Sequence, residues 1–404
     1  MSATDGYIAM NPGRNGGRLS GTAHVQGMTT TQANSTTTMP HMRAIAAGVR
    51  ANVPTLVWGD PGVAKTASLT AFGRASGYHV ETVVGSVRES TDFMGLPYEN
   101  DGVVAYTTLS WAQRCAQADK ALLFFDELTT APPSVQRAML RILQERVVGE
   151  FQLPDSVAIV AAANPASVAV DGWDLPAPIA NRLMHVDWRL DTDGWLAGVM
   201  TGFTTAPETI ETILGRGDVS YRIKVKSQVT TFLRTRPDLL HKMPTDPVTA
   251  GKGWPSPRSW TNAMTVLGEL NPADEDAALI VLTGCVGDGA AGEYLAWLDA
   301  ADLYDPDQVM ADPSIVDWRG SRPDRLFALV YSIAALIQMR PESVRGWLAA
   351  VKVLEACAKG GRPDAAAPAV KLLLAAKPRG ASVPDSLRQA FRDLFAGSGR
   401  WVAA

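Results

Sequence analysis

The chain has 404 residues, of which 46% are hydrophobic and 19% are charged, and its formal net charge is -4 with a pI near 5.8. These values exclude a largely disordered chain, and the length predicts two or three domains rather than one. The chain lacks the overall positive charge of a dedicated DNA-binding protein, so nucleic acid is only a secondary hypothesis as a partner.

Neither membrane insertion nor a disulfide framework is expected. The most apolar run, residues 326–339, is too short to span a bilayer. Cys115, Cys285 and Cys357 are far apart and form no CxxC pair, which argues against both disulfides and a zinc site. The histidines show no metal-ligand spacing, so we assign them to packing. A reducing, cytoplasmic location fits this cysteine usage best.

Residues 1–38 and residues 39–190 differ in amino-acid composition. Residues 1–38 are rich in Gly, Ser, Thr and Asn with few large apolar side chains, which predicts a flexible tail. Between residues 39 and 190, strand-like apolar runs alternate with helical patterns. The predicted strands are 55–58, 78–84, 121–125, 157–162 and 184–190. Such alternation predicts βαβ units, and hence a parallel sheet with helices on both faces.

Helical periodicity takes over after Asp191. The predicted helices include 227–240, 259–270, 276–282, 324–339, 342–358 and 385–395. We divide this part into a helical domain over residues 191–303 and a helical C-terminal region over residues 304–404. The predicted architecture is a three-layer α/β core over residues 39–190, followed by an all-α lid and further helices.

A candidate phosphate-binding loop lies between a predicted strand and a predicted helix. It runs Gly59-Asp60-Pro61-Gly62-Val63-Ala64-Lys65-Thr66-Ala67 and follows the pattern G-x-x-x-x-G-K-[ST], except that Ala64 replaces the last glycine. Glycines let successive N–H groups face a phosphate, and the helix N-terminus adds partial positive charge. Lys65 would reach the β and γ phosphates, and the Thr66 hydroxyl would complete a Mg²⁺ shell. The alternative is a Gly-Pro turn that precedes a lysine by chance.

Two adjacent carboxylates follow the continuous apolar run 121–125, which is typical of a buried central strand. Asp126 and Glu127 would stand at its carboxyl end, where ligands bind in open α/β sheets. Asp126 could hold Mg²⁺ through its water shell, and Glu127 could orient and deprotonate an attacking water. A helix-capping acidic pair is the alternative, but the phosphate-binding loop favours the functional interpretation.

Together these motifs resemble AAA+ ATPases, and the form Gly-x-Pro-Gly-x-Ala-Lys-Thr is similar to the MoxR group, in which alanine is typical at the position of Ala64. The resemblance covers about residues 39–270 and implies ATP as the nucleotide, with Mg²⁺. Asn164, which ends the run 159–164, resembles the sensor 1 residue and would position the attacking water with Glu127. The alternative for Asn164 is a simple Asn-Pro turn.

Two arginines also match positions of this family. Arg182 lies just before the last predicted strand and resembles the arginine finger, which would enter the neighbouring subunit's nucleotide site in a ring and stabilise charge on the γ-phosphate. Arg258 opens a predicted helix and resembles sensor 2, which would contact the γ-phosphate of its own subunit. A surface ion pair is the alternative for each.

Two short segments resemble hairpins of the same family. Residues 90–107 contain an Asp-Gly turn signal and resemble the helix 2 insert of MoxR-type proteins, which faces the pore of the ring; a solvated hairpin is the alternative. Residues 147–151 resemble the hairpin before sensor 1. The preceding arginines, Arg137, Arg141 and Arg146, are expected on the outer face of a helix.

The resemblance implies an ATP hydrolase that works as a homo-oligomeric ring, most often a hexamer, and remodels, assembles or matures a partner protein. A client with a von Willebrand factor A domain is the partner class to expect, as for MoxR relatives. One alternative is a motor or loader that acts on nucleic acid, which salt-sensitive DNA binding would reveal. Another is a nucleotide-gated scaffold with little turnover, although both a water-activating carboxylate and a trans arginine argue against it.

Overall fold

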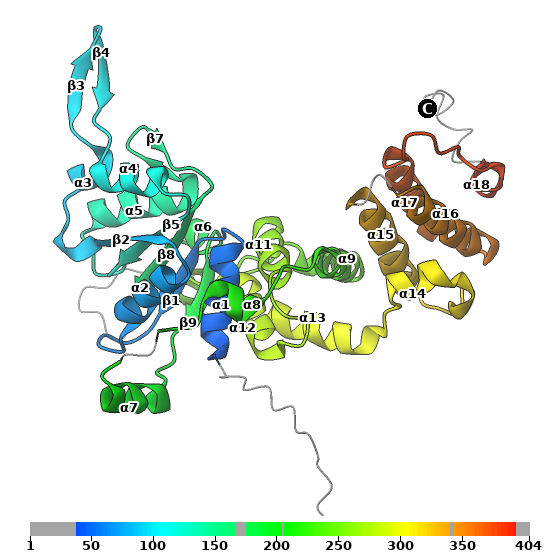
Figure 1. Ribbon diagram of the computed structural model, residues 1–404, viewed down its shortest axis with the longest axis horizontal. Coiled ribbons are helices and arrows are strands. Elements are labelled where there is room, and N and C mark those ends of the chain that lie inside the picture. Colours follow the sequence, from blue (N-terminus) through cyan, green and yellow to red (C-terminus); the bar gives the residue numbers. More distant parts are fainter. Residues whose placement is uncertain (1–37, 166–174, 204–205, 340–342, 393–404) are drawn as a thin grey trace, which may run out of the picture. The chain divides into compact units, whose positions relative to one another are not determined.

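The structure is a computed structural model, and it describes residues 38–165, 175–203, 206–339 and 343–392 (Figure 1). Residues 38–404 form one unit of the chain, and only this unit is described below. The predicted tail therefore lies almost entirely outside the described residues. So does the segment 166–174 that follows the predicted sensor 1 strand.

The centre of this unit is a parallel sheet of five strands in the order β2-β5-β8-β1-β9. Its strands are β1 (Thr55–Trp58), β2 (His79–Val84), β5 (Ala121–Asp126), β8 (Val157–Ala163) and β9 (Met184–Asp187). β8 is buried along its whole length and β5 up to its last residue, as expected for central strands covered on both faces. The predicted parallel α/β sheet is confirmed, with each strand at its expected place in the chain.

The last strand is shorter than predicted. β9 ends at Asp187, whereas the apolar pattern extended it to Leu190. Its only neighbour, β1, ends at Trp58, where the chain turns away into the phosphate-binding loop. Past Trp58, β1 offers no further backbone groups for β9 to pair with. The last bond of this pairing runs from Trp188 N to Trp58 O, and the chain leaves the sheet there.

Side chains of β5 alternate between two cores, one on each face of the sheet. Leu122 and Phe124 face a core that contains α1 (Pro40–Arg50) and α2 (Lys65–Ala75). Leu123 and Phe125 face the other core, which contains α4 (Ser110–Gln117) and α5 (Pro133–Glu145). The sheet is therefore the middle of three layers, with helices above and below it (Figure 1).

Two small hairpins extend the α/β part. β3 (Pro97–Asn100) and β4 (Val103–Tyr106) pair around Asp101 and Gly102, whose φ angles are 51° and 80°. Positive φ at both central residues matches the twist of a two-residue hairpin, so the predicted Asp-Gly turn is confirmed. The hairpin projects from the body of the molecule just after α3 (Thr91–Met94) (Figure 1). The second hairpin joins β6 (Val147–Val148) to β7 (Phe151–Gln152).

Helices make up the rest of the described chain. They are α6 (Ala177–Ala180), α7 (Thr192–Thr201), α8 (Ile210–Leu214), α9 (Val219–Thr235), α10 (Pro247–Ala250), α11 (Pro257–Leu267), α12 (Glu275–Val286), α13 (Asp288–Ala301), α14 (Pro306–Ala311), α15 (Pro323–Met339), α16 (Val344–Lys359), α17 (Pro363–Ala375) and α18 (Asp385–Ala390). α8, α9, α11, α12 and α13 join the core of α1 and α2, whereas α14 to α18 form a third core. No described helix combines the length and apolar character needed to cross a bilayer. The domain boundaries stay predictions.

Several predicted helices have different limits in the structure. The run predicted as 227–240 begins earlier, because the Asp218 carboxylate caps the first turn of α9 by accepting from Ser220 N. It ends at Thr235, two residues before Pro237, since the residue before a proline avoids the helical conformation. α18 runs from Asp385 to Ala390, and the predicted end at residue 395 lies outside the described residues.

Buried and partly buried ion pairs join α1 to the helices of the lid. Glu269 is only 7% exposed and lies between two arginines. Arg50 Nε donates to its carboxylate at 2.8 Å and Arg222 Nη2 at 2.9 Å, while Arg50 Nη2 also donates to Glu269 O at 2.7 Å. Arg43 Nη2 donates to Asp274 Oδ1 at 2.8 Å in the same region. The lid is thus tied to the first helix of the α/β part.

We predict that Glu269→Ala lowers the free energy of unfolding by about 3–5 kcal/mol, because it leaves two partly buried guanidinium groups without their shared carboxylate. Urea unfolding followed by circular dichroism measures the change. Glu145→Ala is the matched control, since Glu145 pairs with Arg141 on an exposed helix surface. Its loss should stay below about 1 kcal/mol. Equal losses in the two variants would contradict a special role of Glu269.

Candidate functional site

The loop between β1 and α2 contains two residues with positive φ. Gly62 has φ 81°, and Ala64, which precedes the first residue of α2, has φ 61°. Side chains with a Cβ atom pay about 1–2 kcal/mol in this left-handed conformation. The glycine of the general pattern avoids that cost, so Ala64 keeps the shape of the loop although its residue type departs from the pattern. The strain is consistent with a functional loop.

Contacts from two neighbouring strands hold this loop. Gly59 N donates to Ala163 O at the end of β8 at 3.2 Å, and the Trp188 indole Nε1 donates to Val63 O at 3.1 Å. A Cβ atom on Gly59 would lie 2.9 Å from Trp188 Cβ, so only glycine fits here without a shift. The loop is therefore fixed from both sides by β8 and by the residue after β9.

Lys65 is 7% exposed and points back into the loop. Its Nζ donates to Gly59 O at 2.5 Å, to Asp60 O at 2.8 Å and to Asn164 Oδ1 at 3.2 Å. Burial lowers the pKa of Lys65, and the nearby Asp126 and Asp60 oppose this effect. None of the described carboxylates forms an ion pair with it. A buried ammonium with only neutral acceptors has charge available for an anion, and this fits a phosphate group.

Asp126 ends β5 directly across from Thr66. Thr66 Oγ1 donates to Asp126 Oδ2 at 2.5 Å, and Glu127 N donates to Asp126 Oδ1 at 2.9 Å. A hydroxyl and a carboxylate are hard oxygen ligands of the kind that Mg²⁺ prefers, usually with waters and substrate phosphates completing the shell. The donor set of Thr66 and Asp126 therefore fits a Mg²⁺ ion that accompanies a bound nucleotide.

Glu127 has φ 58°, a strained conformation for a residue other than glycine. Its carboxylate accepts a hydrogen bond from Ser86 Oγ, which lies just after β2. The neighbouring Thr129 hydroxyl accepts from Asn164 N at 3.2 Å and donates to Asn164 O at 3.1 Å. The predicted water-activating carboxylate and the predicted sensor residue thus meet at the carboxyl edge of the sheet.

Arg182 lies at the amino edge of the sheet, opposite to the edge with Lys65 and Asp126. β9 pairs with β1 in parallel from Thr55 with Met184 to Trp58 with Asp187. Arg182 precedes this ladder by two residues, whereas the phosphate-binding loop follows it. A strand of four residues measures about 13 Å, so the sheet itself separates Arg182 from Lys65 and Thr66 of its own chain. Its guanidinium Nη1 donates to Pro178 O at 2.7 Å.

Arg258 stands beside Arg182, in the first turn of α11. Burial lowers the pKa of Arg182, and the positive charge of Arg258 lowers it further. Neither arginine forms an ion pair with a carboxylate of the described chain. The structure therefore groups Arg258 with Arg182 rather than with Lys65. The predicted contact of Arg258 with the nucleotide of its own subunit does not match this arrangement.

Hydrogen bonds hold the start of α11 against the end of α6. They thereby set the positions of Arg182 and Arg258 relative to each other. Ser256 caps α11 with a capping box and donates its hydroxyl to Asn181 Oδ1. Asn181 Nδ2 donates to Trp254 O at 2.7 Å, and Asn262 Nδ2 donates to Arg182 O at 3.2 Å. Because these polar groups are buried or half-buried, breaking any one of them leaves a costly unpaired group.

A buried histidine connects the two edges of the sheet. Trp58 Nε1 lies 2.9 Å from His185 Nδ1, and His185 Nε2 lies 2.9 Å from Ala180 O. An indole N–H can only donate, so Nδ1 accepts and Nε2 carries the proton that goes to Ala180. The bond from Trp58 requires neutral imidazole, because a protonated Nδ1 could not accept it, and burial lowers the pKa of His185 to about 4. Trp58 precedes the phosphate-binding loop, and Ala180 lies two residues before Arg182.

Several of these supporting residues could not be assigned from sequence. The sequence gives a weak indication that Ser86 belongs to the site, because Ser86 follows β2, and β2 lies next to β5, which ends in Asp126. It gives none for Trp188, Thr129 and His185, since their roles depend on which strands become neighbours. Arg146 was expected on an outer helix face, but it is half-buried with φ 58° and ends α5. Its guanidinium donates to Asn52 Oδ1 and to the carbonyls of Pro154 and Val157.

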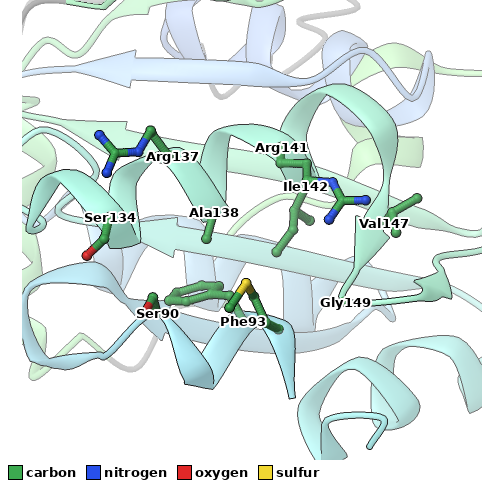
Figure 2. Close-up of a pocket in the computed structure, with 10 residues that line it drawn as sticks. Ser90, Phe93, Ser134, Arg137, Ala138, Arg141, Ile142, Val147 and Gly149 are labelled. Carbon is green, nitrogen blue, oxygen red and sulfur yellow. The ribbon is translucent and has the colours of Figure 1, made fainter. Parts of the chain in front are cut away.

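A cavity of about 320 Å³ lies away from the phosphate-binding loop, between α3, α5 and the β6–β7 turn (Figure 2). Phe93, Ala138 and Ile142 supply apolar lining, and Arg137 and Arg141 stand over it from α5. Arg141 pairs with Glu145 at 2.9 Å. Both arginines are exposed, as their outer-face prediction requires.

Residues 54–183 match the family model of the AAA domain, dynein-related subfamily. Over 174 residues the chain is 29% identical to midasin of Giardia intestinalis, which takes in 39% of this chain but spans only 3% of the length of that protein. A solved ATPase candidate from Cytophaga hutchinsonii superposes with a TM-score of 0.40 at 16% identity, over 60% of this chain and 80% of that one. The α/β part thus matches an AAA domain, and the predicted P-loop α/β fold followed by helices is confirmed.

We predict that acid destabilises the protein partly through His185. The unfolded imidazole titrates near 6.5 and the folded one at about 4, so the unfolded chain binds the proton first as the pH falls. The contribution of neutral His185 to the free energy of unfolding is complete above about pH 6.5. It is lost progressively down to about pH 4, with about 2 kcal/mol lost by pH 5.

The free energy of unfolding in urea, compared at pH 7.5 and pH 5, tests this. His185→Gln cannot bind the proton and should lose about 2 kcal/mol less than the wild type between the two pH values. His241→Gln is the control, because His241 is exposed and should leave the wild-type difference unchanged. If His185→Gln shows the full wild-type loss, the buried neutral histidine is not the cause.

Proposed function

We propose that the protein is an ATPase that binds and hydrolyses ATP with Mg²⁺. The observation that supports this most directly is the meeting of Lys65, Thr66, Asp126 and Glu127 at one edge of the sheet, with the Thr66 hydroxyl bonded to Asp126 at 2.5 Å. The match of residues 54–183 to the AAA domain agrees with it. Adenine as the base rests on that family likeness.

Each residue has a role in this proposal. The loop over residues 59–67 binds phosphate oxygens through the N–H groups that follow Pro61, and Lys65 neutralises the β and γ phosphates. Thr66 and Asp126 hold Mg²⁺, which supplies charge stabilisation on the phosphates. Glu127 orients the attacking water and accepts its proton, and Asn164 helps to position that water. Ser86 holds the Glu127 carboxylate by its hydrogen bond and so acts as a positioning residue.

A ring is proposed because one chain holds only part of the hydrolytic site. Arg182 and Arg258 stand at the edge of the sheet opposite to Lys65. In a head-to-tail ring both would approach the nucleotide of the next copy, where their charges stabilise the leaving γ-phosphate. Arg258 then acts beside Arg182 in trans. A hexamer is the ring size that the MoxR resemblance favours.

We further propose that hydrolysis serves to remodel, assemble or mature a partner protein, as the resemblance to the MoxR group implies. A client with a von Willebrand factor A domain is the first class to test. A cytoplasmic location agrees with three buried free cysteines in the described chain. A nucleic-acid motor is the second candidate by resemblance alone, since the net charge of -4 does not favour DNA binding.

Steady-state ATP hydrolysis tests the proposed chemistry. Glu127→Gln should bind a fluorescent ATP analogue as the wild type does, while turnover falls by about 10²–10⁴-fold because the general base is lost. Lys65→Ala should lose binding itself. Glu99→Gln, an exposed change on β3, is the matched control and should turn over normally. Normal turnover in Glu127→Gln would show that Glu127 is not the base.

Mixing inactive variants tests whether the site is shared between copies. Lys65→Ala and Arg182→Ala should each be inactive alone, but a 1:1 mixture should recover about a quarter of the wild-type rate, because random assembly gives about a quarter of sites with both residues intact. Arg258→Ala should complement Lys65→Ala in the same way. No recovery in mixtures that sizing shows to be co-assembled would contradict action in trans.

A further inference from the structure

Helix α7 is apolar and buries none of its side chains. Trp195, Leu196, Val199 and Met200 are 49%, 52%, 50% and 85% exposed. Leu190 before the helix and Phe203 after it are also exposed. Asp191 caps the helix by accepting from Gly194 N at 2.9 Å, and Gly202 ends it with φ 71°. The helix is thus well formed but lacks a partner within the described chain.

The exposed side chains form one broad stripe. Trp195 and Val199 are four residues apart, as are Leu196 and Met200, so the two pairs lie on adjacent faces of the helix. A helix of ten residues is marginal in water without packing on an apolar face. A contiguous exposed stripe of this kind marks an interaction surface.

The position of α7 indicates what covers it. The helix begins at Thr192, five residues after the last residue of β9 and four after Trp188, whose indole holds the phosphate-binding loop. A link of four residues reaches at most about 14 Å, so α7 lies at the same edge of the sheet as Lys65. In the proposed ring this edge faces the Arg182 edge of the next copy.

That opposite edge has its own exposed apolar side chains. Met243 is 50% and Val248 66% exposed, and Leu240 is exposed beside them. Val248 belongs to α10, which packs against α6 next to Arg182. Lys242 N donates to Pro255 O at 3.0 Å, which ties the segment before α10 to the start of α11, where Arg258 lies. We call Leu240, Met243 and Val248 the α10 patch.

The charges of the two edges are complementary. Asp187, Asp191 and Asp193 lie around the start of α7, with Arg189 as the one described cation among residues 187–193. Arg182, Arg258, Lys242 and Lys252 lie around the α10 patch, and Lys252 is close enough to lower the pKa of His185. Two carboxylates also lie here, but Asp238 pairs with Arg236 and Asp246 caps α10, so positive charge is in excess. Opposite charges on two complementary patches steer them together and disfavour contact between like edges. The arrangement suits a head-to-tail contact rather than a two-fold one.

We infer that α7 of one copy docks on the α10 patch of the next copy of this chain. The contact places the arginine edge of one copy against the nucleotide edge of its neighbour, and α7 supplies the apolar part of the interface. The inference rests on the proposed function for the place of the nucleotide, but its own evidence is the two exposed apolar surfaces and their charges.

Sedimentation of the full chain with ATP and Mg²⁺ tests the contact. Met200→Glu should raise the concentration at which half of the protein assembles by about tenfold or more, because it places a charge at the centre of a desolvated patch. Val248→Glu should do the same from the other side. Leu348→Glu, an exposed change on α16, is the matched control and should assemble normally.

Combined variants identify the pair. Met200→Glu with Val248→Lys should regain assembly, since the two charges meet across the interface, whereas Met200→Glu with Val248→Glu should not. Assembly of Met200→Glu at the wild-type concentration overturns the inference. A lower unfolding midpoint in that variant without any change in assembly also overturns it, because α7 is then covered within its own chain.

Binding of a fluorescent ATP analogue separates the two proposals. Met200 touches none of the residues assigned to the nucleotide, so Met200→Glu should bind the analogue with wild-type affinity while it fails to assemble. If the wild type binds the analogue and assembles but Met200→Glu assembles equally well, only the docking of α7 is wrong. If the wild type fails to bind the analogue, the proposed function fails instead.

Discussion

The parallel alignment of β1, β5 and β8 is the constraint on which the site depends. Because the three strands run in the same direction, their carboxyl ends meet at one edge and bring together side chains that are far apart in sequence. Lys65 follows β1, Asp126 ends β5, and Asn164 follows β8. The hydrogen bonds from Lys65 to Asn164 and from Thr66 to Asp126 join these three strand ends directly. An antiparallel pairing would have sent one of them to the far edge.

The same parallel alignment places Arg182 and Arg258 at the opposite edge of the sheet. Residues that precede a strand of this sheet lie at the amino edge, and Arg182 precedes β9. Hydrogen bonds from the Asn181 region to the start of α11 then bring Arg258 to the same place. The single chain therefore has Lys65 and Asp126 at one edge of the sheet and Arg182 and Arg258 at the other. The buried, neutral His185 connects them through Trp58 and Ala180, so the backbone positions of the two edges depend on each other.

Two residues at the edge where the chemistry is proposed have a strained backbone. Ala64 and Glu127 both have φ near +60° although neither is glycine, and both lie at the carboxyl edge. Such conformations persist only where the surroundings enforce them. Trp188 and the Asp126 carboxylate supply part of that support, through hydrogen bonds to Val63 and to the backbone of Glu127. The buried strands behind them make the edge rigid enough to hold it.

The sequence by itself determined the parallel α/β class and the Asp-Gly hairpin, and it predicted the phosphate-binding loop and the pair Asp126 and Glu127, which the structure brings together at one edge. These features depend on local patterns: an apolar run of strand length, glycines and a lysine at fixed spacing, and a turn dipeptide. The sequence suggested that Arg258 contacts the nucleotide of its own subunit, whereas the structure places it beside Arg182, because its place depends on how α11 packs on α6. Ser86, Trp188 and His185 act only through neighbours that the order of strands creates, and only the structure shows that the apolar side chains of α7 are exposed. Tertiary structure decided these points, since proximity between segments far apart in the chain has no local signal.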